Sequence, residues 1–137
     1  MGKASGEIAD ITVVTAEDPR TEKLYNINPE IITGAESSGA VLIKRFSNTE
    51  EYLKFISGLA FAKIKKEGKK LIFAFDMEDI QSRINAIEFA LRLAQKGDIV
   101  ITEGKGHEQS LCFGTIEYPF TDKSALTSGL KNLGLTK

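Results

Sequence analysis

The chain has 137 residues, which fits one domain able to bury about two thirds of the surface that its unfolded form would expose. Its 18 lysines and arginines nearly cancel its 19 aspartates and glutamates, and neither sign forms a long block, so composition argues against a nucleic-acid or membrane-surface binder. The sequence shows no apolar leader and no apolar run of about twenty residues, so we expect neither secretion nor membrane spanning.

The first predicted elements are a short helix over residues 3 to 9 and a strand over residues 11 to 15. The strand is rich in β-branched residues and lacks strict alternation, which is typical of a strand covered on both faces. It is broken by Glu17-Asp18-Pro19-Arg20, because proline has no N–H and also restrains the residue before it. A polar loop is therefore predicted at the carboxyl end of this strand.

The next predicted helix begins with Asn28 as its cap and Pro29 at its first position, and it fades between Gly34 and Gly39. A strand over residues 40 to 46 follows. The capping-box spacing of Ser47-Asn48-Thr49-Glu50 then predicts a second helix, which Gly68 ends. Its expected apolar stripe comprises Tyr52, Phe55, Ile56, Leu59 and Ala60. The lysines near its end are predicted to form a solvated last turn, with a phosphate or nucleic-acid role as the alternative: Lys63, Lys65, Lys66, Lys69 and Lys70.

A third strand is predicted over residues 71 to 75, and a helix over residues 76 to 95 that Gly97 ends. The apolar residues of this helix recur at helical spacing: Ile80, Ile84, Ile87, Leu91 and Ala94. A fourth strand is predicted over residues 99 to 102. Residues 111 to 120 indicate an antiparallel hairpin with Pro119 at its edge, and Thr121-Asp122 caps a last helix that reaches about Leu133.

Strands that alternate with helices predict right-handed parallel crossovers. The expected fold is therefore a three-layer, Rossmann-like α/β sandwich, with a mostly parallel sheet and an antiparallel edge hairpin. Cys112 is the sole cysteine, which excludes an internal disulfide and leads us to expect a cytoplasmic protein. It stands between two apolar residues of the hairpin, so we expect a buried, inert thiol rather than a nucleophile served by His107.

Two polar loops leave the carboxyl ends of different predicted strands, where open α/β sheets form a crevice. One holds Glu17-Asp18-Pro19-Arg20, and the other, residues 102 to 108, holds the only histidine. Arg20 offers a planar fork for a carboxylate, and Glu108 could pair with an ammonium group, which together suit a zwitterionic amino acid. Gly104 and Gly106 allow a ligand to approach backbone N–H groups.

Other interpretations of these residues remain open. Arg20 could pair with Glu17 or Glu22 on the surface. No metal site is expected, because His107 is the only histidine and Cys112 the only cysteine in the sequence, which is too few ligands for a zinc site. The phosphate-loop pattern also fails around Lys105, which is followed by glycine rather than serine or threonine. Spacing alone therefore predicts a small polar ligand at a sheet crevice.

Residues 15 to 22 and 97 to 108 together resemble the C-terminal domain of the Mur ligases, of the MurE (UDP-N-acetylmuramoyl-tripeptide synthetase) type. Three further segments of the sequence resemble the same family: Met1-Gly2-Lys3, Arg83 with Ala86-Ile87, and Tyr118-Pro119-Phe120-Thr121-Asp122. The resemblance covers residues 1 to 33 and about 80 to 133. It implies a single domain over residues 1 to 137 with the fold expected above.

In that family, a diamino acid is joined to UDP-MurNAc-L-Ala-D-Glu at the expense of ATP, through an acyl-phosphate, during peptidoglycan synthesis. The resemblance implies that Arg20 matches the arginine of the Asp-Asn-Pro-Arg motif that grips meso-diaminopimelate. It also implies that Gly104 and Glu108 contact this amino acid, and that Asp18, which stands where the family has asparagine, belongs to the same substrate-binding set. His107 is expected to orient its loop, with general-base work as the alternative, so no catalytic residue is assigned.

Three departures from the family pattern shape the expected function. Asp18 cannot donate a hydrogen bond when ionised, although Arg20 still favours diaminopimelate over lysine. Residues 34 to 79 are longer than the family's usual connection and suggest an inserted strand–helix element. The chain also starts after the family's first C-domain strand, and it lacks an ATP-binding P-loop and a carbamylated lysine. We therefore expect that it is not a complete ligase alone and that it binds no cofactor by itself.

The leading hypothesis is an amino-acid-binding C-terminal domain of a MurE-type ligase. Its expected partners are the diamino acid and the ATP-binding and UDP-binding domains of the ligase, in cis or in trans, which would bind most of the ATP and Mg²⁺. The alternative is a non-catalytic binding module that retains the fold and uses residues 34 to 79 as a contact surface. A Rossmann-like nucleotide binder is disfavoured, because no Gly-x-Gly-x-x-Gly follows the first strand.

Overall fold

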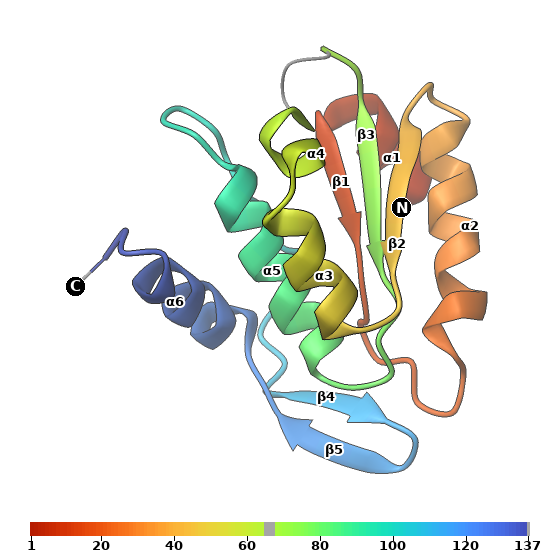
Figure 1. The fold of residues 1–137 in the computed structure, drawn as a ribbon. Coiled ribbons are helices and arrows are strands. Elements are labelled where there is room, and N and C mark those ends of the chain that lie inside the picture. The colour runs from red at the N-terminus through yellow and green to blue at the C-terminus, as the bar shows by residue number, and fades with distance from the viewer. Residues whose placement is uncertain (65–67, 137) are drawn as a thin grey trace.

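Three parallel strands form the centre of the molecule, in the order β1-β3-β2 (Figure 1). The computed structural model describes residues 1–64 and 68–136. Its elements are, in chain order, α1 (Gly2–Ile8), β1 (Ile11–Val14), α2 (Leu24–Glu36), β2 (Val41–Phe46), α3 (Thr49–Ile56), α4 (Leu59–Ala62), β3 (Leu71–Phe75), α5 (Gln81–Leu93), β4 (Ser110–Phe113), β5 (Ile116–Pro119) and α6 (Asp122–Asn132).

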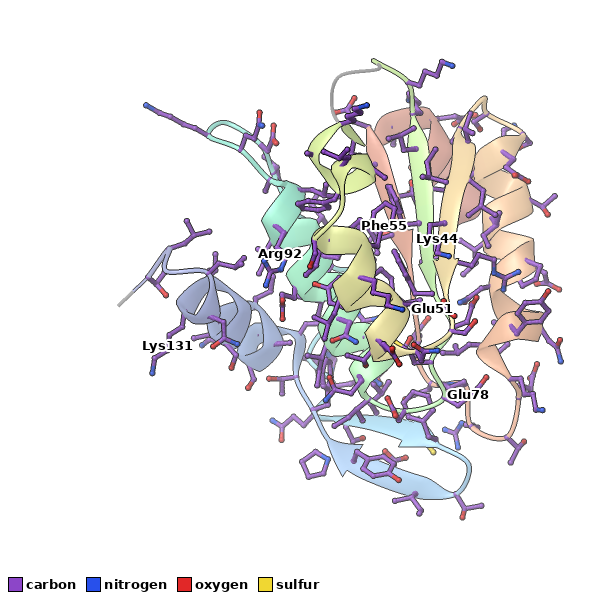
Figure 2. All side chains as sticks on the ribbon, viewed as in Figure 1. Lys44, Glu51, Phe55, Glu78, Arg92 and Lys131 are labelled. Atoms are coloured by element: carbon purple, nitrogen blue, oxygen red, sulfur yellow. The ribbon has the colours of Figure 1, made fainter. Side chains whose placement is uncertain are left out.

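Helices cover both faces of this sheet, so the expected three-layer α/β architecture is confirmed. The central strand β3 is buried along its whole length, as its continuous apolar run predicts. Phe73 and Phe75 face an aromatic cluster with Phe46, Tyr52 and Phe89. Ile72 and Ala74 belong to a cluster with Ile32 and Ala35 of α2, on the other face. Figure 2 shows Phe55 of α3, whose ring lies 5.9 Å from that of Phe73, on the aromatic side.

A second core joins α5, α6 and the hairpin, and its buried members are Ala16, Leu24, Ile87, Leu91, Leu111, Phe113 and Phe120. The hairpin and the last helix form as predicted, and Thr121 caps α6 by accepting a hydrogen bond from the N–H of Ser124. The hairpin is, however, a two-stranded sheet of its own rather than an edge of the main sheet. It lies beyond the carboxyl ends of the parallel strands (Figure 1), where Arg20 forms a bridge to Phe113.

The predicted fourth strand over residues 99 to 102 is wrong. These residues form a loop and pair with no strand that the structure describes. Ile99 and Ile101 are 84% and 73% exposed, and only Val100 packs against the second core. A β-branched run favours an extended chain, but it forms a strand only where a neighbouring strand supplies hydrogen bonds.

Helix α2 also differs from its prediction, because it begins at Leu24 and contains Pro29 in its interior. Proline cannot donate to the Tyr25 carbonyl one turn earlier, and Arg45 donates to that carbonyl instead, over 3.2 Å. Asn28 does not cap the helix but is buried, and it donates to the carboxylate of Asp76 over 2.7 Å. The first N–H of the helix is accepted by Glu78, over 3.1 Å.

The two middle helices are shorter than predicted. Helix α3 is capped by Asn48 and ends at Ile56, so Leu59 lies outside it and is 78% exposed. Helix α5 begins at Gln81, and the residues from Asp76 to Ile80 form a loop. Lys65 and Lys66 of the predicted lysine turn lie outside the described residues. No helix among the described residues is long and apolar enough to cross a membrane.

Candidate functional site

The loop after β1 and the loop before β4 meet at Lys105. We call residues 15 to 23 the β1 loop and residues 94 to 109 the β4 loop. The Lys105 ammonium donates to Asp18 Oδ1 over 3.0 Å and to Glu108 Oε2 over 2.8 Å, and the lysine side chain is fully buried. The two polar motifs singled out in the sequence are therefore adjacent in the fold.

Asp18 is held in its charged form. Burial opposes its ionisation, but the N–H of Cys112, at 2.9 Å, and the Lys105 ammonium outweigh this, so the pKa of Asp18 lies below its ordinary value. Burial also opposes the charge of Lys105, and the Glu108 and Asp18 carboxylates outweigh it, so the pKa of Lys105 is raised. The three groups thus form a charged unit with one cation and two anions.

Arg20 adopts a left-handed backbone conformation, with φ of 54°, which is uncommon for a residue other than glycine. Two backbone hydrogen bonds hold it there: its N–H donates to the Cys112 carbonyl over 3.2 Å, and its carbonyl accepts from the N–H of Gly114. Its side chain is exposed and forms no ion pair with any described residue, so the alternative pairing with Glu17 or Glu22 is not observed. The guanidinium is available to a ligand.

Gly104 lies where only glycine fits. Its φ is +98°, and an added Cβ would lie 2.9 Å from Cδ of Glu17. The β4 loop then turns through a hydrogen bond from the N–H of Glu108 to the Lys105 carbonyl, and His107 is exposed on this turn. Glycine at this position therefore lets the two loops approach each other.

The remaining donors and acceptors fit a zwitterion. The side chain of Glu108 is 49% exposed, and only its Oε2 pairs with Lys105, so Oε1 can accept from a ligand ammonium. Arg20 can bind a carboxylate through its planar fork.

No group of three histidine, cysteine, aspartate or glutamate side chains among the described residues could hold a metal ion. Cys112 is buried, as expected.

Lys105 is the site residue that sequence reasoning did not identify. A lysine between two glycines is most often exposed in a turn. The signal that could have found it is its position three residues before Glu108, on a loop predicted to face the acidic β1 loop.

Known proteins resemble the chain along nearly all of its length, although no protein-family model matches it. The UDP-N-acetylmuramoyl-L-alanyl-D-glutamate–2,6-diaminopimelate ligase of Geobacter metallireducens is 30% identical over 133 residues, which are 97% of this chain and 22% of the ligase. The UDP-N-acetylmuramyl-tripeptide synthetase of a Roseiflexus species is 31% identical over 134 residues, which are 98% of this chain and 20% of the synthetase. The chain thus spans about a fifth of the length of the curated relatives it matches.

Proposed function

Because the chain belongs to the MurE-type Mur ligases and matches their C-terminal portion, we propose that it is the amino-acid-binding C-terminal domain of such a ligase. The reaction is the ATP-dependent joining of a diamino acid, meso-diaminopimelate, to UDP-MurNAc-L-Ala-D-Glu in cytoplasmic peptidoglycan synthesis. The observation that carries the proposal is the Lys105 bridge between Asp18 and Glu108, since it joins the two loops that hold the exposed Arg20 and Gly104.

Each residue has a defined part in this proposal. Arg20 binds a carboxylate of the amino acid, and Glu108 Oε1 accepts a hydrogen bond from its ammonium group. Gly104 brings the backbone close to the ligand. Asp18 supports the site by holding Lys105 and the N–H of Cys112, so it needs no donor of its own. His107 orients the turn that carries Glu108. The bound amine is thereby positioned for attack on the activated carboxyl group.

ATP and Mg²⁺ are proposed to bind mainly to other parts of the ligase. The glycine-rich loop lacks the pattern that cradles phosphates, and no acidic cluster suited to a metal ion occurs among the described residues. We therefore assign these cofactors to the ATP-binding and UDP-binding parts of the ligase, as partners in cis or in trans.

Residues 34 to 79 contain the strand–helix element that we propose to be inserted relative to the family.

Calorimetry of the chain with meso-diaminopimelate, lysine and ATP tests the proposal. We expect meso-diaminopimelate to bind and the Arg20→Ala variant to weaken binding about tenfold or more, which is about 1.4 kcal/mol. Arg92→Ala is the matched control, because Arg92 is exposed and pairs with Glu88 on α5 instead. Binding of none of the three compounds would contradict the proposal and favour the non-catalytic module, whereas binding of ATP alone would favour a nucleotide binder.

A further inference from the structure

Arg83 of α5 is a buried arginine that is only 4% exposed. Its Nε and Nη2 donate to the two carboxylate oxygens of Asp122, each over 2.7 Å. Its Nη1 donates to the Ala16 carbonyl over 2.9 Å, and its Nη2 also donates to the Glu103 carbonyl over 2.8 Å. One side chain therefore contacts the β1 loop, the β4 loop and the start of α6.

The two carbonyls that Arg83 binds stand next to proposed site residues. Ala16 lies near the start of the β1 loop, two residues before Asp18, and Glu103 directly precedes Gly104. In a planar trans peptide the C=O and the following N–H point in opposite directions. Binding the Glu103 carbonyl therefore aims the Gly104 N–H away from Arg83, and binding the Ala16 carbonyl does the same for the N–H of Glu17.

These two N–H groups are available to a ligand. Neither donates a hydrogen bond to a described residue, and Gly104 and Glu17 are both exposed. The two residues also lie side by side, since a Cβ on Gly104 would contact the Glu17 side chain. Free N–H groups that are fixed in direction suit an anionic group of the ligand.

We propose that Arg83 is a positioning residue of the amino-acid site: it fixes the peptides before Glu17 and Gly104 so that their N–H groups face the carboxylate of the bound amino acid. This inference rests on the proposed function. Arginine suits the task because its planar fork has five donors, which serve the bidentate Asp122 pair and both carbonyls together. A lysine can keep the charge pair with Asp122, but its single nitrogen cannot reproduce the fork.

Two variants separate positioning of the loops from anchoring of α6. Arg83→Lys keeps the charge opposite Asp122 but loses contacts to the loop carbonyls. Asp122→Asn keeps the donors of Arg83 for those carbonyls but removes its counter-charge. The control is Arg92→Lys, the same substitution at an exposed position of the same helix (Figure 2). If Asp122→Asn does not fold, Asp122→Glu takes its place, because the added methylene group displaces the carboxylate from its bidentate pairing at the start of α6 while Arg83 keeps its donors for the two carbonyls.

Each variant is assayed for its thermal midpoint, for amide hydrogen exchange at Arg20 and Glu108, and for meso-diaminopimelate affinity at a temperature where it is fully folded. We expect Arg83→Lys to weaken binding about tenfold and to speed exchange at both amides. Asp122→Asn should lower the midpoint more than Arg83→Lys does but change affinity less than about threefold.

The inference is overturned if Arg83→Lys leaves exchange and affinity at the level of Arg92→Lys. Arg83 would then only anchor α6. If the wild-type chain binds no diamino acid, the proposed function fails, and the exchange measurement still decides whether Arg83 fixes the two loops.

Discussion

At the residue scale, Lys105 decides how the two loops of the site meet. Its ammonium lies between two carboxylates, and without it Asp18 and Glu108 would be like charges close together. A buried lysine is stable only when its charge is paired and hydrogen-bonded, and here both partners supply hydrogen bonds. The same contacts leave one carboxylate oxygen of Glu108 for a ligand.

Replacing Lys105 by methionine should therefore lower the free energy of unfolding by about 1–3 kcal/mol, because both carboxylates lose a charged partner. Urea denaturation at neutral pH measures the change. Lys54→Met is the control, since its contact with Glu50 is 3.9 Å long and exposed, and removal of such a pair should cost less than about 0.5 kcal/mol. If the free energy of unfolding fell equally in the two variants, the Lys105 bridge would contribute no more to stability than an exposed ion pair.

The pH dependence of stability should report Asp18. Its pKa is lower in the folded state than in the unfolded chain, so its contribution is present at neutral pH. That contribution is lost as the pH falls from about 4 through the lower folded-state pKa. In the Asp18→Asn variant the side chain does not titrate, although its amide oxygen can still accept from the N–H of Cys112. The stability difference between wild type and this variant should therefore shrink on acidification, and parallel curves would contradict the assignment.

The candidate site residues were chosen from local sequence, but the buried lysine that joins their two loops was not predicted. Arg20, Gly104 and Glu108 stand in recognisable motifs, and their residue types already suit a zwitterion. Lys105 could not be assigned from the sequence, because its burial depends on how closely the two loops approach. The burial of a charged residue is a property of the tertiary fold rather than of its neighbours in the chain.

At the scale of elements, α2 shows how tertiary contacts override a good local signal. Asn28-Pro29 has the pattern of a helix start, yet the helix begins at Leu24, where Glu78 accepts the first N–H. Proline is tolerated inside the helix because Arg45 binds the carbonyl that proline leaves without a partner. Residues 99 to 102 show the converse, since a good strand signal there finds no neighbouring strand among the described residues.

Pro29→Ala should raise the free energy of unfolding by about 1–2 kcal/mol, because alanine restores the hydrogen bond within the helix and has the higher helix propensity. Thermal or urea denaturation measures the gain. Asn26→Ala, at an exposed position of the same helix, controls for propensity alone and should gain about 0.5 kcal/mol. A loss of stability in Pro29→Ala would mean that the restriction proline places on the unfolded chain dominates.

At the scale of the whole molecule, the layers depend on one close contact between helices. Helix α1 packs on α2 through glycines, and a Cβ added at Gly6 would lie 2.6 Å from the Ala35 carbonyl oxygen. That oxygen belongs to the backbone of α2 and cannot rotate away as a side chain could. The position of the outer layer over the sheet therefore depends on the absence of a side chain.

Gly6→Ala should lower the free energy of unfolding by about 1–3 kcal/mol, although alanine is the better helix former. Chemical denaturation followed by circular dichroism provides the measurement. Ala4→Val adds volume at an exposed position of the same helix and should change stability by less than about 1 kcal/mol. A stabilised Gly6→Ala protein would show that α1 shifts at little cost.

The alternation of strands and helices was enough to predict the layered α/β architecture. It did not predict that the hairpin would form a separate sheet or that the main sheet would contain three strands among the described residues. Those features depend on which distant segments pair, and strand propensity carries no information about partners. The hairpin itself was predictable, because its two strands are neighbours in the chain.

The Lys105 bridge also makes formation of the candidate site depend on contacts between distant parts of the chain. Asp18 and Lys105 are separated by 87 positions in the chain, and Ala16 and Arg83 by 67. Such distant contacts carry a large loop-closure entropy and form slowly, whereas helices form within microseconds. During synthesis, Asp18 leaves the ribosome well before its partner does. The nascent β1 loop therefore lacks its counter-charge until the β4 loop has also emerged.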